Sequence, residues 1–433
     1  MEYIVASCSD EKVIQQVRDV VEKDFRDEYL LRFAENEEEF KERLNFELPE
    51  LVLVDFSDPQ LDAERLRDII QRDSWLHNFG VVGLFDRQRD GEAELLDANR
   101  GMNLLALIER GRVESHLGKT LRIIAANRQL VIQDFLADKL VNRFNGSFQI
   151  SNEDYLLAPV YAGLLAVSLV RLGKISPEER HGVQMCLSEL VLNGIEHGNC
   201  GITYEEKSSF LATGASMADL VSQRCEDEAI SSRCVSLDWD IGDEACKFSI
   251  RDGGDGFDVA AFRDKISRNQ GKQDFHGRGI MMARLVADRL VYNRKGNRVT
   301  VLLNFKEGLE QAAPEGFANQ ESIKILAGNV LMKAGEFADC IYYVVSGTFG
   351  VYFQNQLVGR ITPADIFTGE MAFLLNNTRS ATVIAETNAK VIRIPRKAFV
   401  EAIKSYPQYS IFLSKLLARR IVRANANAVT RSQ

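Results

Sequence analysis

The chain has 433 residues, of which 45% are hydrophobic and 27% charged, and this is the composition of an ordinary folded protein. At about 100–200 residues per domain, its length predicts several domains rather than a single core. Its formal net charge of -9 argues against nucleic-acid binding as the role of the whole molecule, because a phosphate backbone is bound chiefly by clustered Lys and Arg.

No apolar run reaches the roughly 18 residues that cross a bilayer, and the N-terminus lacks a basic region followed by an apolar stretch. The seven cysteines are scattered and form no CxxC pair, so they predict neither a zinc site nor a redox motif. We therefore expect a cytoplasmic protein with reduced thiols that contacts neither a membrane nor DNA directly.

The first segment of the chain, residues 1–120, alternates short apolar runs with helical patterns. The apolar runs cover residues 3–6, 51–54 and 81–84, and the helical patterns cover 11–23 and 63–72. Strands that alternate with helices predict a parallel sheet of the α/β class.

Asp55 ends the apolar run LVLVD, and this segment resembles the receiver domain of response regulators, which carry a phosphorylated Asp at that position. The other chemical residues differ. Cys8 and Ser9 replace the acidic pair, Phe85 replaces the switch hydroxyl, and no Lys follows the strand expected at 105–108. Without Mg²⁺ and Lys, nothing neutralises the transferred phosphoryl group. We expect a degenerate receiver-like module for docking or homodimer formation that is not phosphorylated.

The middle of the chain, from residue 121 to 305, begins with two long helical patterns at 156–172 and 177–197. Alternating strand patterns follow at 235–239, 246–251 and 298–304, which predicts a layer of helices on a sheet. Between them, residues 200–232 form a polar stretch that is longer than a simple helix-to-strand loop. We interpret this stretch as an insert that regulates the domain or binds a partner.

Glu189 and Asn193 lie in the segment CLSELVLNGIEHGN, four residues apart and therefore on one face of a helix. An Asn carbonyl oxygen suits Mg²⁺, and a carboxylate one turn away can deprotonate an attacking hydroxyl. The alternative is an ordinary capped helix end, because Gly198 and Asn199 are good helix terminators.

Two glycine-rich segments follow in order. IRDGGDGFD places Asp252 at a strand end, where its carboxylate can accept a hydrogen bond from the adenine amine, and Gly254 and Gly256 where backbone must approach a ligand. HGRGIMMARL places Gly277 and Gly279 before a helix, whose free N–H groups attract phosphate. A polar hairpin turn would explain the first segment equally well, but all three elements in this order predict an ATP site.

At these residues the chain resembles the GHKL superfamily, and within it the serine kinases that act as anti-sigma factors; the resemblance covers about residues 145–305. It implies that Glu189 is the catalytic base, Asn193 the Mg²⁺ ligand and Asp252 the adenine reader. It also implies an ATP lid at 257–276. The resemblance assigns the nucleotide loops to Gly254, Gly256, Gly277, Arg278 and Gly279.

The subtype of kinase depends on the histidines. These are His77, His116, His181, His197 and His276. None lies in a segment that resembles the phospho-accepting helix of a histidine kinase, so we expect a serine/threonine kinase that acts on a separate protein. The resemblance implies an anti-sigma-factor antagonist of the STAS type as the substrate and a sigma factor as a second candidate partner.

Residues 306–321 are polar, contain Pro314 and Gly316, and show no amphipathic period, so we interpret 306–322 as a linker. Short strand patterns at 342–345, 348–353, 381–385 and 390–394 then predict a small β-roll, with a helical end at 397–423. An apolar stripe on that end predicts a ligand cover or a dimer seam. The stripe consists of Tyr409, Phe412, Leu413, Leu416 and Leu417.

The segment IFTGEMAFLLNNTRSATVIA contains Glu370 at the start of a short apolar helix and Arg379 nine residues later. N–H groups and a buried Arg suit a cyclic phosphate, and the carboxylate suits a ribose hydroxyl; the alternative is that the two side chains simply pair. The segment resembles the phosphate-binding cassette of cyclic-nucleotide-binding domains. The resemblance implies cAMP or cGMP as the effector and a site made of Gly369, Glu370, Met371, Arg379 and Ser380, and the Ser380 hydroxyl favours cGMP.

The sequence thus predicts a multidomain protein: an α/β receiver-like domain at 1–120, an α+β GHKL ATPase sandwich at 121–305, the linker at 306–322, and a β-roll with flanking helices at 323–433. The function that this order favours is a protein kinase that uses ATP and Mg²⁺ and is regulated by a cyclic nucleotide in a bacterial partner-switching pathway. The alternative is a non-catalytic partner-binding or scaffold protein under nucleotide control.

Overall fold

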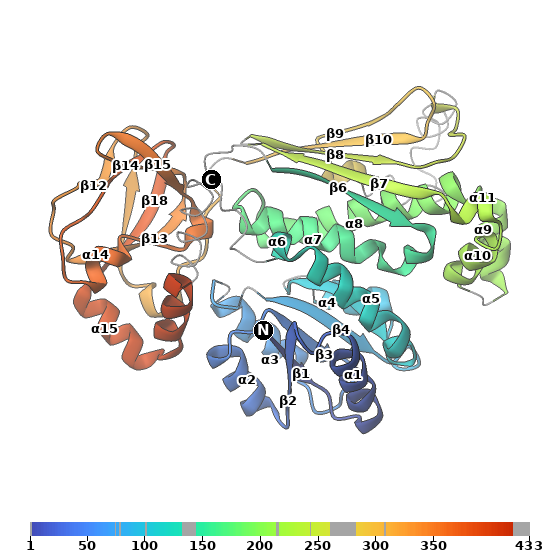
Figure 1. Ribbon diagram of the computed structural model, residues 1–433, viewed down its shortest axis with the longest axis horizontal. Helices are drawn as coiled ribbons and strands as arrows, with labels where there is room; N and C mark the ends of the chain where they lie inside the picture. Colours follow the sequence, from blue (N-terminus) through green and yellow to red (C-terminus); the bar gives the residue numbers. More distant parts are fainter. Residues whose placement is uncertain are drawn as a thin grey trace. The chain divides into compact units, whose positions relative to one another are not determined.

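The computed structural model describes residues 2–73, 75–77, 79–99, 102–131, 144–213, 216–242, 244–259, 283–306 and 309–418 (Figure 1). The chain divides into two compact units. Unit 1 consists of Met1–Leu140, Val167–Ser176 and Glu307–Gln433. Unit 2 consists of Val141–Ala166 and Pro177–Lys306.

Unit 1 begins with a parallel sheet of five strands in the order β2-β1-β3-β4-β5. This is the flavodoxin-like doubly wound order, in which ligands bind at the carboxyl ends of the strands. The strands are β1 (Glu2–Ser7), β2 (Tyr29–Ala34), β3 (Leu51–Asp55), β4 (Gly80–Phe85) and β5 (Leu104–Glu109). The helices are α1 (Glu11–Asp24), α2 (Glu37–Phe46), α3 (Ala63–Arg72), α4 (Glu92–Ala98), α5 (Val113–Ala126) and α6 (Arg128–Val131).

Alternating side chains of the strands bury both faces of this sheet. On one face, Val52 and Val54 pack with α2 and α3 in a single apolar cluster. Helix α1 buries the stripe Val13, Val17 and Val21, whose spacing is that of one helix face. The parallel α/β sheet predicted from the apolar runs is therefore present. The sequence analysis did not identify β2, although five of the six residues in YLLRFA are hydrophobic.

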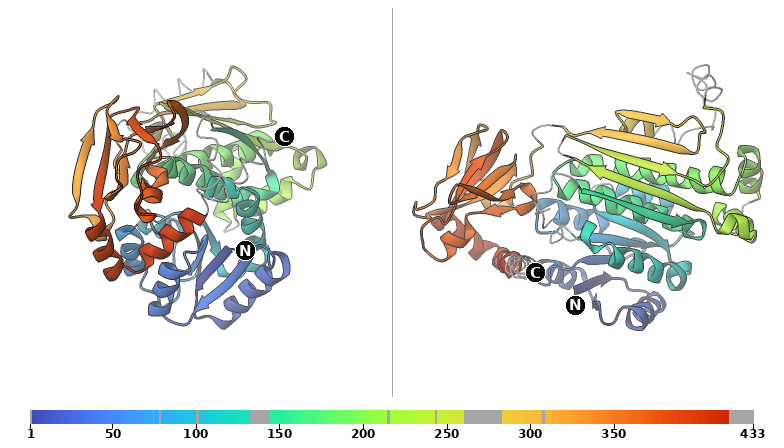
Figure 2. Two further views of the ribbon diagram at one scale, coloured as in Figure 1. Left: turned by 60° about the vertical axis from the view of Figure 1, so that its left-hand side comes forward. Right: turned by 45° about the horizontal axis from the view of Figure 1, so that its top comes forward.

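Unit 2 contains an antiparallel sheet in the order β6-β7-β8-β10-β9, with long helices along one face (Figure 2). The strands are β6 (Phe144–Ser151), β7 (Cys234–Ile241), β8 (Ala245–Arg251), β9 (Arg289–Tyr292) and β10 (Arg298–Asn304). The long helices are α7 (Ala158–Arg171), which begins in this unit, and α8 (Pro177–Asn193). Alternate residues of β7 are buried, as expected for a sheet covered on one face.

The polar stretch 200–232 is largely helical. It contains α9 (Tyr204–Ala212), α10 (Met217–Arg224) and α11 (Glu228–Ser231). Ser216 caps α10 in a capping box with Asp219, which explains why this helix begins where it does. The stretch is therefore a folded insert, and its role stays a prediction.

The helical stretch Asn152–Arg171 has the length and apolar composition of a membrane-spanning helix, with a mean hydropathy of 1.4. This stretch is not an unbroken apolar run in the sequence, because its first residues are polar. However, 61% of its most apolar window is buried inside the protein, which is also the behaviour of a core helix. We therefore treat it as the central helix of a packed layer.

The C-terminal part of unit 1 is a β-roll of two four-stranded sheets, in the orders β11-β18-β13-β16 and β12-β17-β14-β15. The strands of the first sheet are β11 (Glu321–Ile325), β13 (Cys340–Ser346), β16 (Phe367–Thr368) and β18 (Ala389–Pro395). The strands of the second sheet are β12 (Val330–Met332), β14 (Phe349–Phe353), β15 (Gln356–Ile361) and β17 (Thr382–Ala385). Two short helices complete the roll: α14 (Glu370–Leu374) and α15 (Arg396–Ser405).

The helical end is not one continuous helix from 397. Helix α15 ends at Ser405, and helical residues 408–418 follow after Pro407. A proline disfavours the helical conformation of the residue before it, and Tyr406 accordingly has φ -130 and ψ 72. The segment interpreted as a linker is also partly packed, since Phe317 is 1% exposed and lies in the apolar core around these helices.

Candidate functional site

Helix α8 presents Glu189 and Asn193 one turn apart, and both side chains are half-buried. The chain then continues in a π-helical turn, η4 (Gly194–Asn199), instead of stopping at the predicted terminators. Such turns are rare and occur often at functional sites, because the extra residue re-aims the backbone. In this protein the turn carries Gly198 and Asn199 to the loop that follows β8.

Close backbone contacts join η4 to the loop of Asp252. A Cβ atom on Gly198 would lie 2.3 Å from Cγ of Asp252, and a Cβ on Gly254 would lie 2.1 Å from the carbonyl oxygen of Gly198. Gly256 has a φ of +80, and a Cβ there would lie 1.9 Å from the Lys295 carbonyl oxygen. Any larger residue would push the backbone apart, so these glycines are required by close approach.

Asn199 ties the same two segments together by hydrogen bonds. Its Oδ1 accepts from the backbone N–H of Gly253 at 2.7 Å, and its Nδ2 donates to Oδ1 of Asn152 at 2.7 Å. Asn152 in turn donates to the carbonyl of Ile230 at 2.8 Å. Both Asn side chains are fully buried, so a fully satisfied polar chain fixes the site. The sequence analysis read Asn199 only as a helix terminator, and no local signal marks its second role.

The two candidate carboxylates both have raised pKa values. Burial is the main cause of the raised pKa of Glu189, while Lys207 lowers it and Glu196 raises it further. Burial also raises the pKa of Asp252, and the hydrogen bond from the backbone N–H of Gly254, at 2.9 Å, partly offsets this. A carboxylate that holds its proton more readily is a better proton acceptor in catalysis near neutral pH.

Glu196 is a buried carboxylate that the sequence analysis did not single out. It accepts hydrogen bonds from Nζ of Lys207 at 2.6 Å and from the hydroxyl of Tyr155 at 2.6 Å. These bonds fasten α9, the first helix of the insert, to the turn that carries Gly198. The insert thus supports the loop geometry of the site directly.

Part of the predicted ATP site lies outside the described residues. This holds for Gly277, Arg278, Gly279 and His276, and for the predicted lid beyond residue 259. The structure therefore brings together the first two of the three predicted elements. The third stays a prediction.

Arg379 is the central side chain of the second candidate site, and it is buried. Its guanidinium donates to the carbonyl of Gly369 at 2.7 Å and to the carbonyl of Cys340 at 2.6 Å. Glu370, the residue after Gly369, is buried, whereas Met371 and Ser380 are exposed. Gly369 has a φ of +81, and a Cβ there would lie 2.4 Å from Nη1 of Arg379. The glycine therefore allows the close packing of Arg379 on the loop.

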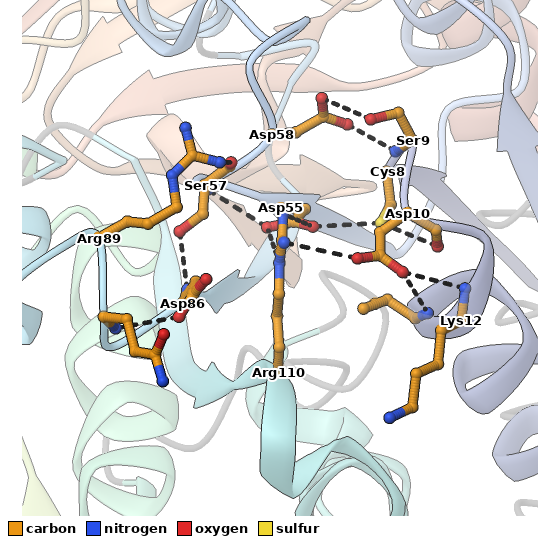
Figure 3. Close-up of polar contacts among 12 residues, drawn as sticks. Cys8, Ser9, Asp10, Lys12, Asp55, Ser57, Asp58, Asp86, Arg89 and Arg110 are labelled. Carbon is orange, nitrogen blue, oxygen red and sulfur yellow. Dashed lines mark hydrogen bonds and ion pairs between the residues drawn. The ribbon is translucent and has the colours of Figure 1, made fainter.

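An ion pair between Arg110 and Asp55 lies at the carboxyl end of the N-terminal sheet (Figure 3). Nη2 of Arg110 lies 2.8 Å from Oδ2 of Asp55, and its Nε donates to Oδ1 at 3.2 Å. The Cys8 thiol donates to the same carboxylate at 3.2 Å, as does the backbone N–H of Ser57 at 3.2 Å. Burial is the first cause of a strongly raised pKa of Cys8, so this thiol stays protonated.

Neighbouring side chains close this edge further. The backbone N–H of Ser9 donates to Asp58 at 2.6 Å, and its hydroxyl donates at 2.8 Å. The hydroxyl of Ser57 accepts from the backbone N–H of Asp86 (Figure 3). The same hydroxyl donates to Asp90. The sequence analysis sought a Lys after 105–108 and missed Arg110. Strand β5 in fact extends to Glu109, which makes Arg110 the first residue after it.

Two of the histidines, His77 and His197, have ring nitrogens within hydrogen-bond distance of protein oxygens. Both ring nitrogens of buried His77 lie within hydrogen-bond distance of protein oxygens, the Ile69 carbonyl at 3.1 Å and Oδ1 of Asn45 at 2.9 Å. Burial lowers the pKa of His77 to about 4. His197 lies in η4, with Nδ1 2.6 Å from the carbonyl oxygen of Ile202. The burial of His77 does not suit a phospho-acceptor, whereas His197 is exposed and one of its ring nitrogens lies against a backbone carbonyl.

Two family models match the chain. Residues 152–303 match the histidine kinase-like ATPase domain, and residues 322–406 match the cyclic nucleotide-binding domain.

Curated relatives share only a short segment with this chain. Lysophospholipase NTE1 of Pyricularia oryzae is 28% identical over 105 residues, which are 23% of this chain and 7% of that protein. Lysophospholipase nte1 of Aspergillus oryzae is 28% identical over 106 residues, with the same shares. The chain therefore covers less than a tenth of these relatives, and their enzymatic activity does not transfer to it.

Two solved structures are similar to parts of the chain. The catabolite activator protein of Thermus thermophilus is 23% identical, covers 28% of this chain and 60% of its own, and has a TM-score of 0.26. A structure from a cyclic-GMP-dependent signalling pathway of bacterial phytopathogenesis is 26% identical, covers 27% and 96%, and has a TM-score of 0.23. Such low TM-scores carry no argument. From the family models, the chain joins a histidine kinase-like ATPase domain and a cyclic nucleotide-binding domain in one polypeptide.

Proposed function

We propose that this protein is an ATP-dependent serine/threonine protein kinase whose activity a cyclic mononucleotide controls. The observation that carries the proposal is the close approach of η4 to the loop of Asp252. The turn η4 continues the helix that carries Glu189 and Asn193. Gly198 and Gly254 can approach each other only because neither has a side chain. The domain family supports ATP as the nucleotide.

Each candidate residue has a chemical role in this proposal. Glu189 takes the proton from the attacking hydroxyl, and its raised pKa suits that task. Asp252 accepts a hydrogen bond from the adenine amine. Asn193, half-buried one turn from Glu189, has the side-chain oxygen that a hard cation needs. Mg²⁺ held there would neutralise phosphate charge.

The proposed acceptor is a Ser or Thr of a separate protein of the anti-sigma-factor-antagonist type, within a partner-switching pathway. The supporting observation concerns the histidines: no His lies in a segment that resembles the phospho-accepting helix of a histidine kinase, and His77 is buried between two protein oxygens. The proposed cellular setting is the cytoplasm, and the proposed assembly is a homodimer. A sigma factor is the second proposed partner.

The experiment is incubation of the full chain with labelled ATP and candidate antagonist proteins, with and without cAMP or cGMP. The proposal expects label on Ser or Thr of the partner, and a transfer rate that changes with the cyclic nucleotide. Label on a histidine of this chain would contradict the assigned acceptor. Binding of the partner without any transfer would favour the non-catalytic partner-switching role.

The cyclic-nucleotide half of the proposal is tested at Arg379. Removing it leaves the phosphate without a partner, and hydrogen bonds to charged groups are worth about 1.5–3 kcal/mol. We expect Arg379→Ala to bind cAMP or cGMP at least about tenfold more weakly by calorimetry, since about 1.4 kcal/mol is a factor of ten. Arg360→Ala is the matched control, because Arg360 pairs with Glu386 instead. Equal affinities in both variants would contradict the assignment.

A further inference from the structure

Trp75 of the N-terminal domain lies within the apolar core of the β-roll in unit 1. It follows α3 in sequence, and its side chain is only 6% exposed. Its ring contacts three aromatic rings edge-on: Phe367 at a centroid distance of 5.7 Å, Tyr409 at 4.7 Å and Phe412 at 4.9 Å. Edge-to-face aromatic pairs stabilise a contact beyond the burial of their apolar surface. Leu48 and Leu76 of the same domain belong to this cluster as well.

Asp73, two residues before Trp75, anchors the contact with polar bonds. Its Oδ1 accepts from the hydroxyl of Tyr409 at 2.8 Å, from Nε1 of Trp75 at 3.0 Å and from the backbone N–H of Glu315 at 3.3 Å. The donors come from both sides of the contact. Asp73 is buried, so losing any of them would leave a buried charge less well satisfied. This is an ordered interface rather than a loose apolar contact.

A further polar contact continues the interface along the helical residues 408–418. Nζ of Lys415 donates to the carbonyl of Leu48 at 2.8 Å and lies 3.6 Å from Glu2 at the start of β1. The apolar stripe predicted on this helix therefore faces the N-terminal domain in part. Its Tyr409 and Phe412 are the ring partners of Trp75.

The same cluster reaches the candidate cyclic-nucleotide site. Phe367 begins β16 and stands two residues before Gly369, whose carbonyl accepts from Arg379. Strand β16 pairs with β13, and the other acceptor of Arg379, Cys340, is the first residue of β13. Of the two carbonyls that hold the guanidinium, Cys340 therefore belongs to the strand pair that carries Phe367, and Gly369 follows the second strand of that pair directly as the N-cap of α14. A phosphate that draws the guanidinium toward itself would disturb these bonds.

We propose that the N-terminal domain senses the occupancy of the cyclic-nucleotide site through Phe367, Trp75 and Tyr409. A ligand can shift an arrangement only if its interactions differ between two states. The bonds from Arg379 to Gly369 and Cys340 supply that difference, because a phosphate that pulls the guanidinium toward itself weakens its hold on these two carbonyls. The inference rests on the proposed binding of a cyclic nucleotide at Arg379. It assigns to the receiver-like domain an input from inside the chain instead of a phosphoryl group.

The test uses the full chain and its two tryptophans, Trp75 and Trp239. The variant Trp239→Phe leaves Trp75 as the sole reporter. Calorimetry with cAMP and cGMP measures binding, and the emission of Trp75 is followed in a parallel titration. We expect the emission to change and to saturate with the same midpoint as the heat. The variant Arg379→Ala should lose both signals together.

The affinity of substituted variants gives the second measurement. If Trp75 takes part in the two-state equilibrium, altering it shifts that equilibrium and with it the apparent affinity for the ligand. We expect Trp75→Phe and Asp73→Asn to change the affinity for the cyclic nucleotide by at least about fivefold, the lower limit of typical coupling. Trp239→Phe is the matched control, because it makes the same substitution at another buried tryptophan. Its affinity should equal that of the wild type.

The outcomes separate this inference from the proposed function. A cyclic nucleotide that binds with unchanged Trp75 emission, and with equal affinity in the wild type, Trp75→Phe and Asp73→Asn, would overturn the inference and leave the proposed site standing. The interface would then be a fixed structural contact. If no cyclic nucleotide binds the wild type, the proposed function fails first and the inference fails with it.

Discussion

Asp55 and Asp252 each stand at the carboxyl end of a β-strand, but their surroundings differ in kind. Asp55 is fully buried and lies against Arg110, the Cys8 thiol and a backbone N–H, so its charge is cancelled from within the domain. Asp252 is half-buried and is surrounded by glycine backbone, and among the described residues it makes no ion pair. The carboxylate of Asp55 is therefore already paired with a cation of its own domain. The carboxylate of Asp252 accepts from backbone and, in the described part of the chain, has no such cation.

The difference shows how the same residue serves stability in one place and binding in another. An internal cation makes a buried carboxylate tolerable and costly to disturb. A carboxylate that accepts from backbone N–H groups and has no cationic partner keeps lone pairs that can accept further hydrogen bonds. The substitutions below should therefore affect binding and chemistry at the site of Asp252, and stability at the site of Asp55.

The largest effect is expected at Glu189, on the helix α8 that continues into the turn η4, whose Gly198 and Asn199 contact the Asp252 loop. General-base catalysis contributes typically 10²–10⁴-fold, so Glu189→Gln should lower phosphotransfer by at least about a hundredfold and keep ATP binding. Glu178→Gln is the matched control, since Glu178 is exposed in the first turn of the same helix. A rate equal to that of the control would remove Glu189 from the chemistry.

The pH dependence follows from the raised pKa of Glu189. Catalysis needs the deprotonated carboxylate, so the wild-type rate should fall on acidification at a pH above the ordinary glutamate value of 4.5. The folded state also binds the proton more tightly than the unfolded chain, so this group's contribution to stability decreases as pH rises through the window. Glu189→Gln should therefore be at least as stable as the wild type at neutral pH, which thermal melts would show.

The second effect is a loss of stability when the ion pair between Arg110 and Asp55 is broken. Arg110→Ala leaves the buried carboxylate of Asp55 without its cation, and breaking such a pair costs about 3 kcal/mol or more. Urea unfolding measures the loss. Arg112→Ala is the control, because Arg112 makes a half-exposed pair with Glu109 at 3.6 Å that is worth less than about 1 kcal/mol.

Equal losses of unfolding free energy in the two arginine variants would contradict the stabilising role of the pair between Arg110 and Asp55. A chemical test accompanies them. Treatment of the wild type with acetyl phosphate should leave its intact mass unchanged, because Arg110 pairs with the carboxylate and Cys8 and Ser9 stand where a receiver has the acidic pair that holds Mg²⁺. A stable phosphoryl adduct at Asp55 would show that this edge still works as a phospho-acceptor.

The third effect concerns ATP affinity. Asn193→Ala and Asp252→Ala should each weaken binding of a non-hydrolysable ATP analogue by at least about tenfold, since each removes about one hydrogen bond or ligand to a polar or charged group. Asp255→Ala is the control, an exposed carboxylate in the same loop. Unchanged affinity in the first two variants would contradict the assigned ATP site.

The sequence predicted most elements of the fold, because regular spacing of apolar residues reports which face is buried. Helix α3 has the predicted bounds, and β10 begins and ends where expected. The sequence did not reveal Arg110 on Asp55, since the two are 55 residues apart and only the parallel strand order brings them together. The buried bond between Asp73 and Tyr409 spans 336 residues and leaves no local pattern.

Close backbone approach was predictable at two glycines. It was expected at Gly254 and Gly256, and a Cβ atom at either position would clash with a backbone carbonyl. The sequence analysis interpreted Gly198 only as a helix terminator, although a Cβ there would lie 2.3 Å from Asp252. The supports of the site were not predictable. Glu196 and Asn199 are polar residues that would suit a solvent-exposed helix end equally well, and only the folded chain buries them with partners.

The most direct measurement of the central claim is a reciprocal titration of the full chain. Cyclic nucleotide is titrated with and without a saturating non-hydrolysable ATP analogue, and ATP analogue with and without cyclic nucleotide. The account predicts that each ligand binds and that each changes the other's affinity by the same factor, at least about fivefold, because coupling between binding sites is reciprocal. Two ligands that bind with affinities independent of each other would contradict the account of a cyclic-nucleotide-controlled, ATP-using protein.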